Sequence, residues 1–180
     1  MWEISKDFNF AAGHRVHNQT LNSEYSLDSQ CVCRHLHGHE YKITVHLKSS
    51  SLVGGFVTDF KHLNWFKKFL DDVLDHKFII DRNDPLFDTM LGNSLSLDGY
   101  IKFDEGYSIV DMNSSYLSQI SEHHYEYFES FVIVDFVPTS ENLGKWLYQI
   151  AKDKMKKIDV DVSRLELFET AKSRSCYSEG

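Results

Sequence analysis

Residues 31–48 read CVCRHLHGHEYKITVHLK, a cluster of cysteines and histidines that runs directly into an alternating segment. The apolar positions of this alternation are Tyr41, Ile43, Val45 and Leu47. A period of two predicts a half-buried β-strand, because successive side chains of a strand point to opposite faces. Continued backwards, the apolar parity reaches His39 and His37. We therefore expect both imidazoles on one side of one strand.

The segment 2–14 has the same period, with mostly apolar residues at even positions, and the same parity ends at His14. Residues two apart on a strand lie about 6 to 7 Å apart on one face, so His37 and His39 can reach one ion. His14 is the candidate for a third ligand. Three histidines with an open fourth position are typical of a catalytic zinc site. The alternative is that His37-Gly38-His39 arises by chance or serves only the surface.

Cys31 and Cys33 leave several chemistries open. A structural zinc site with His37 and His39 is one alternative, but the spacing C-x-C-x3-H-x-H differs from that of zinc fingers. A redox pair is another, although such motifs usually have two intervening residues. If histidines hold the metal, a thiolate beside the dication can serve as base or nucleophile.

Three further segments carry candidate site residues, each with a structural alternative. Asp75-His76 joins a carboxylate to an imidazole, but a histidine at a helix C-terminus also interacts favourably with the helix dipole. Glu169 ends the inward face of a strand predicted over 163–170, or it is a solvated carboxylate. Thr139 and Ser140 begin a helix, and the alternative is that they only cap it.

The remaining pattern predicts an α+β protein. Residues 54–60 favour a turn and a short third strand, with Asp59 capping an amphipathic helix that ends near Leu74. A hairpin is expected over 100–110, a short strand over 131–136, and a second helix after Pro138. The segment 115–130 has no clear periodicity.

Length and composition limit the function classes. A chain of 180 residues corresponds to one domain, 1–180, and a net charge of −8 disfavours nucleic-acid binding, so a small molecule is the expected partner. The beginning of the sequence lacks the apolar core of a signal peptide, and no apolar run is long enough to cross a membrane. Three cysteines do not suggest a disulfide framework, which favours the reducing cytoplasm.

Six segments together resemble the 6-pyruvoyltetrahydropterin synthase and 6-carboxytetrahydropterin synthase family. They occur in the family's order and span nearly the whole chain. The matching segments are 10–15 (FAAGHR), Cys33 with 37–39 (HGH), 55–60 (GFVTDF), 74–76 (LDH), 138–142 (PTSEN) and 168–170 (FET).

The resemblance implies a tunnelling fold, in which a four-stranded antiparallel sheet carries two helices on one face and trimers form a barrel. It also implies a homohexamer, a dimer of trimers with active sites between subunits. The implied roles are zinc binding by His14, His37 and His39, catalysis by Cys33 with Asp75 and His76, and binding of the pterin by Glu169, Thr139 and Ser140. The implied substrate is 7,8-dihydroneopterin triphosphate.

Two departures from the family pattern bear on the product. The pyruvoyl type has its cysteine six residues before the first histidine of His-Gly-His and the carboxy type four before, and this chain has both, Cys31 and Cys33. Leu36 favours the carboxy type, a lyase of the pathway to queuosine and other 7-deazaguanines. The second departure is a long segment at about 86–130, interpreted as an insertion. The alternatives are a pyruvoyl-type lyase and a catalytically silent pterin- or zinc-binding homologue.

Overall fold

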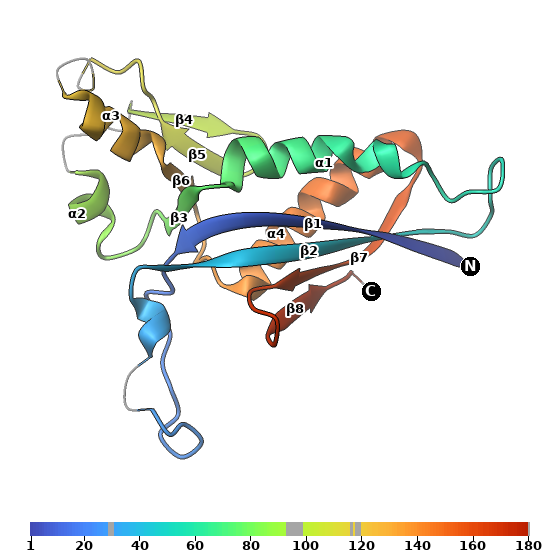
Figure 1. Cartoon of the computed structure of the whole chain (residues 1–180), viewed down its shortest axis with the longest axis horizontal. Coiled ribbons are helices and arrows are strands. Elements are labelled where there is room, and N and C mark those ends of the chain that lie inside the picture. Colours follow the sequence, from blue (N-terminus) through green and yellow to red (C-terminus); the bar gives the residue numbers. More distant parts are fainter. Residues whose placement is uncertain (29–30, 93–98, 116, 118–119, 180) are drawn as a thin grey trace. The chain divides into compact units, whose positions relative to one another are not determined.

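The computed structural model describes residues 1–28, 31–92, 99–115, 117 and 120–179. It contains an eight-stranded sheet with the order β4-β5-β6-β3-β1-β2-β7-β8 (Figure 1). The chain divides into two compact units, and strands β1 (Trp2–His14) and β2 (His37–Ser49) have residues in both. The expectation of a four-stranded sheet is therefore wrong in strand number.

The first unit comprises 1–11, 39–75 and 139–180. Here β2 pairs antiparallel with β7 (Asp161–Phe168), which pairs antiparallel with β8 (Arg174–Tyr177). The unit has two long helical segments. The first is α1 (Asn64–Phe69), which the 3-10 helix η2 (Phe60–Leu63) precedes and the π-helical turn η3 (Leu70–Leu74) follows. The second is α4 (Ser140–Met155), which the short 3-10 helix η6 (Lys156–Ile158) follows. Both predicted helices are confirmed.

Aromatic contacts join the helices to the strands of this unit. The rings of Phe8 on β1 and Phe66 on α1 pack edge to face at 5.2 Å, and Phe69 on α1 lies 6.1 Å from Trp146 on α4. The apolar face predicted for the first helix is buried, including Leu63 and Leu70. The helix spacing therefore predicts the packed face correctly, because three- and four-residue steps return to the same side of a helix.

The second unit comprises 12–38 and 76–138. The end of β1 pairs in parallel with β3 (Lys77–Asp81), and β3 pairs in parallel with β6 (Phe131–Val134). The hairpin of β4 (Tyr100–Phe103) and β5 (Tyr107–Val110) then joins β6 antiparallel. The sheet is therefore mixed rather than wholly antiparallel. The hairpin predicted over 100–110 and the short strand predicted over 131–136 are confirmed. The sequence analysis missed β3, a short run without alternation.

The segment at 86–130 contributes to a hydrophobic core of the second unit. It contains α2 (Phe87–Leu91), the hairpin, and α3 (Glu122–Glu129), a helix that the sequence analysis did not predict. The buried members of this core are Ile80, Leu91, Val110, Leu117, Phe128, Phe131 and Ile133. The described parts of the segment therefore help to cover strands β3 and β6. Residues 93–98, 116 and 118–119 of the expected insertion lie outside the described residues.

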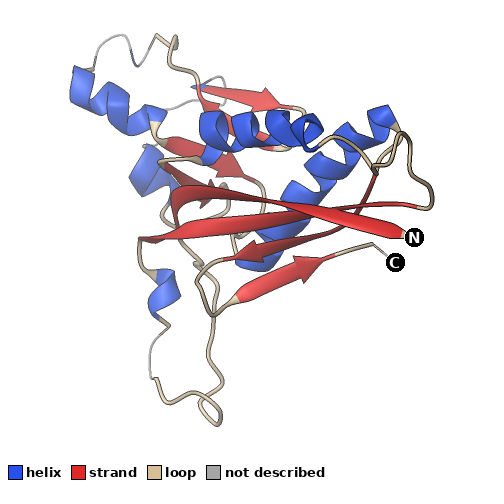
Figure 2. Ribbon diagram, turned by 45° about the vertical axis from the view of Figure 1, so that its right-hand side comes forward, coloured by secondary structure: helices blue, strands red, loops and turns tan. Residues whose placement is uncertain are grey.

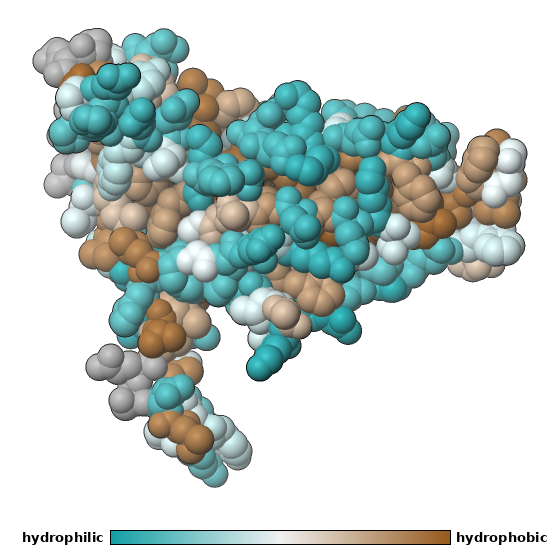
Figure 3. Space-filling model, in the orientation of Figure 1, coloured by the Kyte–Doolittle hydropathy of each residue, from teal (hydrophilic) through white to brown (hydrophobic). Residues whose placement is uncertain are grey.

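One local prediction needs correction. The expected third strand at 54–60 is a turn with one isolated bridge between Val53 and Phe56, because Gly54 and Gly55 adopt positive φ angles of 62° and 97°. Apolar side chains are exposed at this turn, which forms a hydrophobic patch on the surface (Figure 3). Asp59 does cap the following helix, since its side chain accepts a hydrogen bond from the amide of Lys61 at 2.8 Å.

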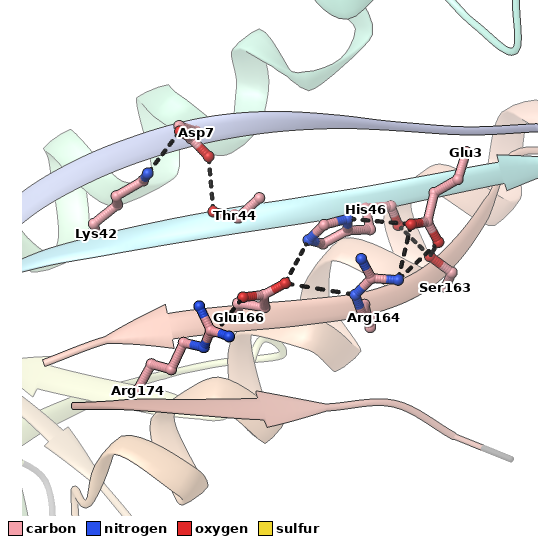
Figure 4. A network of polar contacts seen from close by, with 9 residues as sticks. All are labelled: Glu3, Asp7, Lys42, Thr44, His46, Ser163, Arg164, Glu166 and Arg174. Atoms are coloured by element: carbon pink, nitrogen blue, oxygen red, sulfur yellow. Dashed lines mark hydrogen bonds and ion pairs between the residues drawn. The ribbon is translucent and has the colours of Figure 1, made fainter. Parts of the chain in front are cut away.

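The polar positions of the first unit's strands form a charged network (Figure 4). Glu3 and Glu166 flank His46, and Arg164 contacts both carboxylates, at 2.8 Å and 3.5 Å. Lys42 pairs with Asp7 at 2.8 Å. The hydroxyl of Ser163 donates to Glu3, and this bond is the largest cause that lowers the pKa of that carboxyl. The network covers His46, which is buried although the alternation predicts a half-exposed strand face.

Among the described residues, no helix combines the length and the apolar character needed to cross a membrane.

Candidate active site

His14 and His37 face each other within the second unit. Nδ1 of His14 lies 2.7 Å from the carbonyl oxygen of Pro138, and Nδ1 of His37 lies 2.9 Å from that of His35. A carbonyl oxygen can only accept a hydrogen bond, so both Nδ1 atoms carry the hydrogen. In the neutral rings, both Nε2 atoms then present lone pairs, and they lie 3.1 Å apart. This arrangement is unfavourable unless a cation or an extra proton lies between the two atoms.

A metal ion satisfies this geometry. His14, His37 and His39 are a group whose ligand atoms all lie within 4.8 Å of one another. His39 follows His37 by two residues on β2, as the strand parity predicts. In a tetrahedral zinc site with Zn–N distances of about 2.0 to 2.1 Å, two ligand nitrogens are about 3.3 Å apart, close to the His14–His37 separation. The residues therefore fit a zinc ion, with carbonyl groups orienting two of the rings.

A glycine between the two histidines of β2 permits a close backbone approach. A Cβ atom added to Gly38 would lie 2.8 Å from the carbonyl oxygen of Ala12 on β1. Any other residue at this position must displace that backbone. Gly38 thus brings the segment that carries His37 close to the segment that ends at His14.

Glu169 lies beside His39 in the first unit. The strand β7 ends at Phe168, one residue earlier, and Oε1 of Glu169 lies 3.8 Å from Nε2 of His39. Burial raises the pKa of Tyr41, and the Glu169 carboxylate raises it further. Glu169 is therefore a half-buried carboxylate close to a candidate metal ligand, as its place at the end of an inward strand face predicts.

Asp75 and His76 connect the first helix to β3. The helix ends at Leu74 with Asp75 as its cap, and His76 is the next residue. Oδ1 of Asp75 accepts a hydrogen bond from the amide of Ala11 at 2.8 Å. His76 has a φ of 59°, a left-handed conformation that is uncommon outside glycine and asparagine. Such backbone strain is concentrated at functional sites, although it does not assign a role.

The two cysteines lie on the loop between β1 and β2, which protrudes beyond those strands (Figure 2). Cys33 is in the 3-10 helix η1 (Val32–Arg34) and is partly buried, and its carbonyl oxygen accepts from the amide of Val16 at 2.9 Å. Cys31 lines a cavity of about 560 Å³ together with Arg34 and His35. Both cysteines therefore belong to the segment that directly precedes β2.

Thr139 and Ser140 begin α4, and Thr139 caps it by accepting from the amide of Asn142 at 3.3 Å. Thr139 therefore caps the helix, which is the structural alternative given in the sequence analysis. The carbonyl oxygen of Ser140 accepts from the hydroxyl of Ser175 at 2.8 Å. These contacts involve the Thr139 hydroxyl and the Ser140 backbone.

The carbonyl oxygens of Pro138 and His35, which orient His14 and His37, are missing from the sequence prediction. Main-chain groups carry no side-chain signal, so residue type cannot reveal them. Asp81 and Asp84, which are buried beside the loop between β1 and β2, are also missing from the sequence prediction. Their signal is two carboxylates directly after the apolar run of β3.

Comparisons with known proteins assign the chain to a family. The sequence profile of the 6-pyruvoyl tetrahydropterin synthase family matches residues 3–180. The chain belongs to this family. A relative from Aquifex aeolicus, named 6-carboxy-5,6,7,8-tetrahydropterin synthase, is 33% identical over 99% of this chain and 98% of its own length.

Solved structures extend the comparison. A crystal structure of an uncharacterized protein from Wolinella succinogenes has a TM-score of 0.95 and is 46% identical, covering 99% of this chain and 98% of that one. The 6-pyruvoyl tetrahydropterin synthase of Caenorhabditis elegans has a TM-score of 0.56 at 19% identity, with 99% and 96% covered, and supports the fold alone. Membership of the tetrahydropterin synthase family makes the chain an enzyme of the lyase class.

Proposed function

We propose that this family member is a zinc-dependent 6-carboxy-5,6,7,8-tetrahydropterin synthase. The observation that carries the proposal is the match, over nearly all of both chains, to the Aquifex aeolicus protein of that name. The histidine group supports the metal requirement. The proposed substrate is 7,8-dihydroneopterin triphosphate, and the proposed pathway leads to queuosine and related 7-deazaguanines.

His14, His37 and His39 would hold the zinc ion. The bound ion supplies a Lewis acid that stabilises negative charge on the oxygens of the substrate side chain. The carbonyl groups of Pro138 and His35 hold the rings of His14 and His37 in the tautomer that offers Nε2 to the metal. These contacts already restrict the two histidine side chains, so less conformational entropy is lost when the metal binds.

Glu169, Thr139 and Ser140 are the proposed pterin-binding residues. A carboxylate can accept two hydrogen bonds from the amino-pyrimidinone edge of a pterin, and the position of Glu169 beside His39 would bring that edge close to the metal ligands. Thr139 and Ser140 would line the same pocket. Their capping contacts fix the backbone at the start of α4, which helps to hold a bound ring in one orientation.

Cys33, Asp75 and His76 are the proposed proton-transfer residues. Removal and return of protons on the substrate side chain near neutral pH requires a thiolate or an imidazole within reach of those carbons. In this proposal the protein is a homohexamer, a dimer of trimers. Asp75 and His76 of one subunit act together with Cys33 of a neighbouring subunit. Light scattering of the purified protein tests the assembly.

Product analysis tests the activity. Incubation of the zinc-loaded protein with 7,8-dihydroneopterin triphosphate should give triphosphate, acetaldehyde and a 6-carboxylated pterin, identified by mass spectrometry. Triphosphate with a 6-pyruvoyl product and no acetaldehyde would show the pyruvoyl-type lyase instead, for which Cys31 has the family spacing. Absence of turnover, with zinc bound, would indicate a silent homologue.

A further inference from the structure

Two buried carboxylates lie at the end of strand β3 in the second unit, Asp81 as its last residue and Asp84 in the turn that follows. Asp81 and Asp84 are only 3% and 4% exposed. An ionised carboxylate in such a position is costly unless a cation or hydrogen-bond donors compensate for its lost hydration. Neither residue belongs to the metal centre or to the proposed substrate pocket. Their burial therefore needs another explanation.

Both carboxylates bind the segment that directly follows the candidate ligand His14. Nε of Arg15 lies 2.9 Å from Oδ2 of Asp84, an ion pair that is not aligned as a hydrogen bond. Nε2 of His17 lies 2.9 Å from Oδ2 of Asp81. The side chains of Arg15 and His17 are themselves 14% and 13% exposed, so solvent screens these contacts little.

The turn after β3 fixes the other oxygen of each carboxylate. Oδ1 of Asp81 accepts from the backbone amide of Asn83 at 2.9 Å, and Oδ1 of Asp84 accepts from the amide of Leu86 at 2.8 Å. Each carboxylate is thus held by its own turn on one side and bound to the 15–17 segment on the other. The two contacts form a rigid clamp between the two segments.

Val16, between the two clamped residues, contacts η1. Its side chain is 6% exposed, and its amide donates to the carbonyl oxygen of Cys33 at 2.9 Å. The backbone of Cys33 is therefore attached to the end of β3 through Val16 and the two flanking contacts, the Arg15–Asp84 ion pair and the His17–Asp81 hydrogen bond. Among the described residues of the loop that carries Cys33, the apolar side chains of Leu27 and Val32 are exposed.

We infer that Arg15, His17, Asp81 and Asp84 are positioning residues that fix the backbone of Cys33 for the reaction. This inference rests on the proposed role of Cys33 as the reacting thiol. Displacement of a reacting group by about 1 Å can cost about 100-fold in rate, so a loop thiol requires an anchor of this kind.

The test uses variants that remove one charge of the clamp, Asp84→Asn and Asp81→Asn. The matched control is Asp72→Asn, which breaks the exposed pair with Lys68 on the helix surface and changes the net charge equally. All are made in a background with Cys31→Ser and Cys176→Ser, so that Cys33 is the one remaining thiol. The rate of its reaction with an aromatic disulfide reports its placement without requiring turnover.

We expect Asp84→Asn and Asp81→Asn to change the thiol reaction rate at least several-fold and Asp72→Asn to leave it unchanged. In the chain with all cysteines present, kcat should fall by about 10- to 100-fold, while KM and zinc content stay close to their original values. If Asp84→Asn does not fold, Arg15→Lys replaces it, since it keeps the charge but loses the guanidinium geometry, and an intermediate loss of kcat is expected.

Unchanged thiol reactivity and kcat in folded clamp variants, with only a lower free energy of unfolding, would show a purely structural role and overturn the inference. The proposed function fails independently if the original protein gives no 6-carboxylated product or if Cys33→Ala retains turnover. The thiol reaction rate still decides the positioning of Cys33 in that case.

Discussion

Nε2 of His14 and Nε2 of His37 lie 3.1 Å apart, and a backbone carbonyl accepts from the opposite nitrogen of each ring. Two lone pairs that face each other at this distance repel, so the pair is stable only with a positive charge between them. A divalent metal ion meets this need. The arrangement of the two rings therefore fits a metal ion.

Removal of a candidate ligand should strongly weaken metal binding. We expect His14→Ala and His37→Ala to weaken zinc binding by at least about 100-fold, since even partners that only orient a ligand contribute about 10- to 100-fold. Zinc content by plasma emission spectrometry measures this directly. The control is His123→Ala, because the side chain of His123 is 95% exposed. Full zinc occupancy in both ligand variants would contradict the assignment.

The two cysteines should differ in function. We expect Cys33→Ala to abolish turnover and Cys31→Ala to leave most of it, with zinc retained in both, because histidines hold the metal in this proposal. Rates of product formation and zinc content, measured on the same samples, check both parts. Loss of zinc in either variant would indicate cysteine ligation. The reverse order of activities would favour the pyruvoyl type.

Gly38→Ala should destabilise the protein by about 1 to 3 kcal/mol, the usual cost of overpacking. The new methyl group would meet the carbonyl oxygen of Ala12 at 2.8 Å, and a backbone atom cannot move aside as a flexible side chain can. Urea unfolding of the metal-free protein measures the change. The control is Ser5→Ala, at an exposed position of the same strand as Ala12. Equal stability of both variants would disprove the close approach.

The Glu3 network predicts a defined pH dependence of stability. The Ser163 hydroxyl is the largest cause that holds the pKa of Glu3 below its ordinary value of 4.5 in the folded protein. A lowered folded pKa adds stability above the unfolded pKa, and this contribution is lost as the pH falls through the folded value. We therefore expect Ser163→Ala to destabilise the protein near neutral pH and to reduce the loss of stability between about pH 5 and pH 3.

Unfolding free energies across that pH range test the prediction. Ser175→Ala is the control, because its hydroxyl donates to the uncharged carbonyl of Ser140. Ser175→Ala should lower the free energy of unfolding by the same amount at every pH. If Ser163→Ala behaves in the same way, the hydroxyl does not stabilise the ionised form of Glu3.

Much of the first unit could be predicted from local pattern. The alternation at 37–48 and the three- and four-residue steps at 63–74 correctly predict a strand and a helix, because each element repeats its buried face with its own period. Asp59 and Thr139 were also recognised as caps from residue type. The second unit was less predictable, since β3 is a short apolar run and α3 is polar and aromatic over most of its surface.

The sequence by itself determined which side chains are candidates for the chemistry. Strand parity placed His37 and His39 on one face and His14 at the end of another, and those side chains form the candidate metal centre. Only the tertiary structure decided that the carbonyl groups of Pro138 and His35 orient the rings, and that Asp81 and Asp84 clamp the loop of Cys33. The physical reason is the distance along the sequence over which each effect acts. Periodicity acts over a few neighbouring residues, whereas these contacts join segments that are separated along the chain and meet only after the strands have paired.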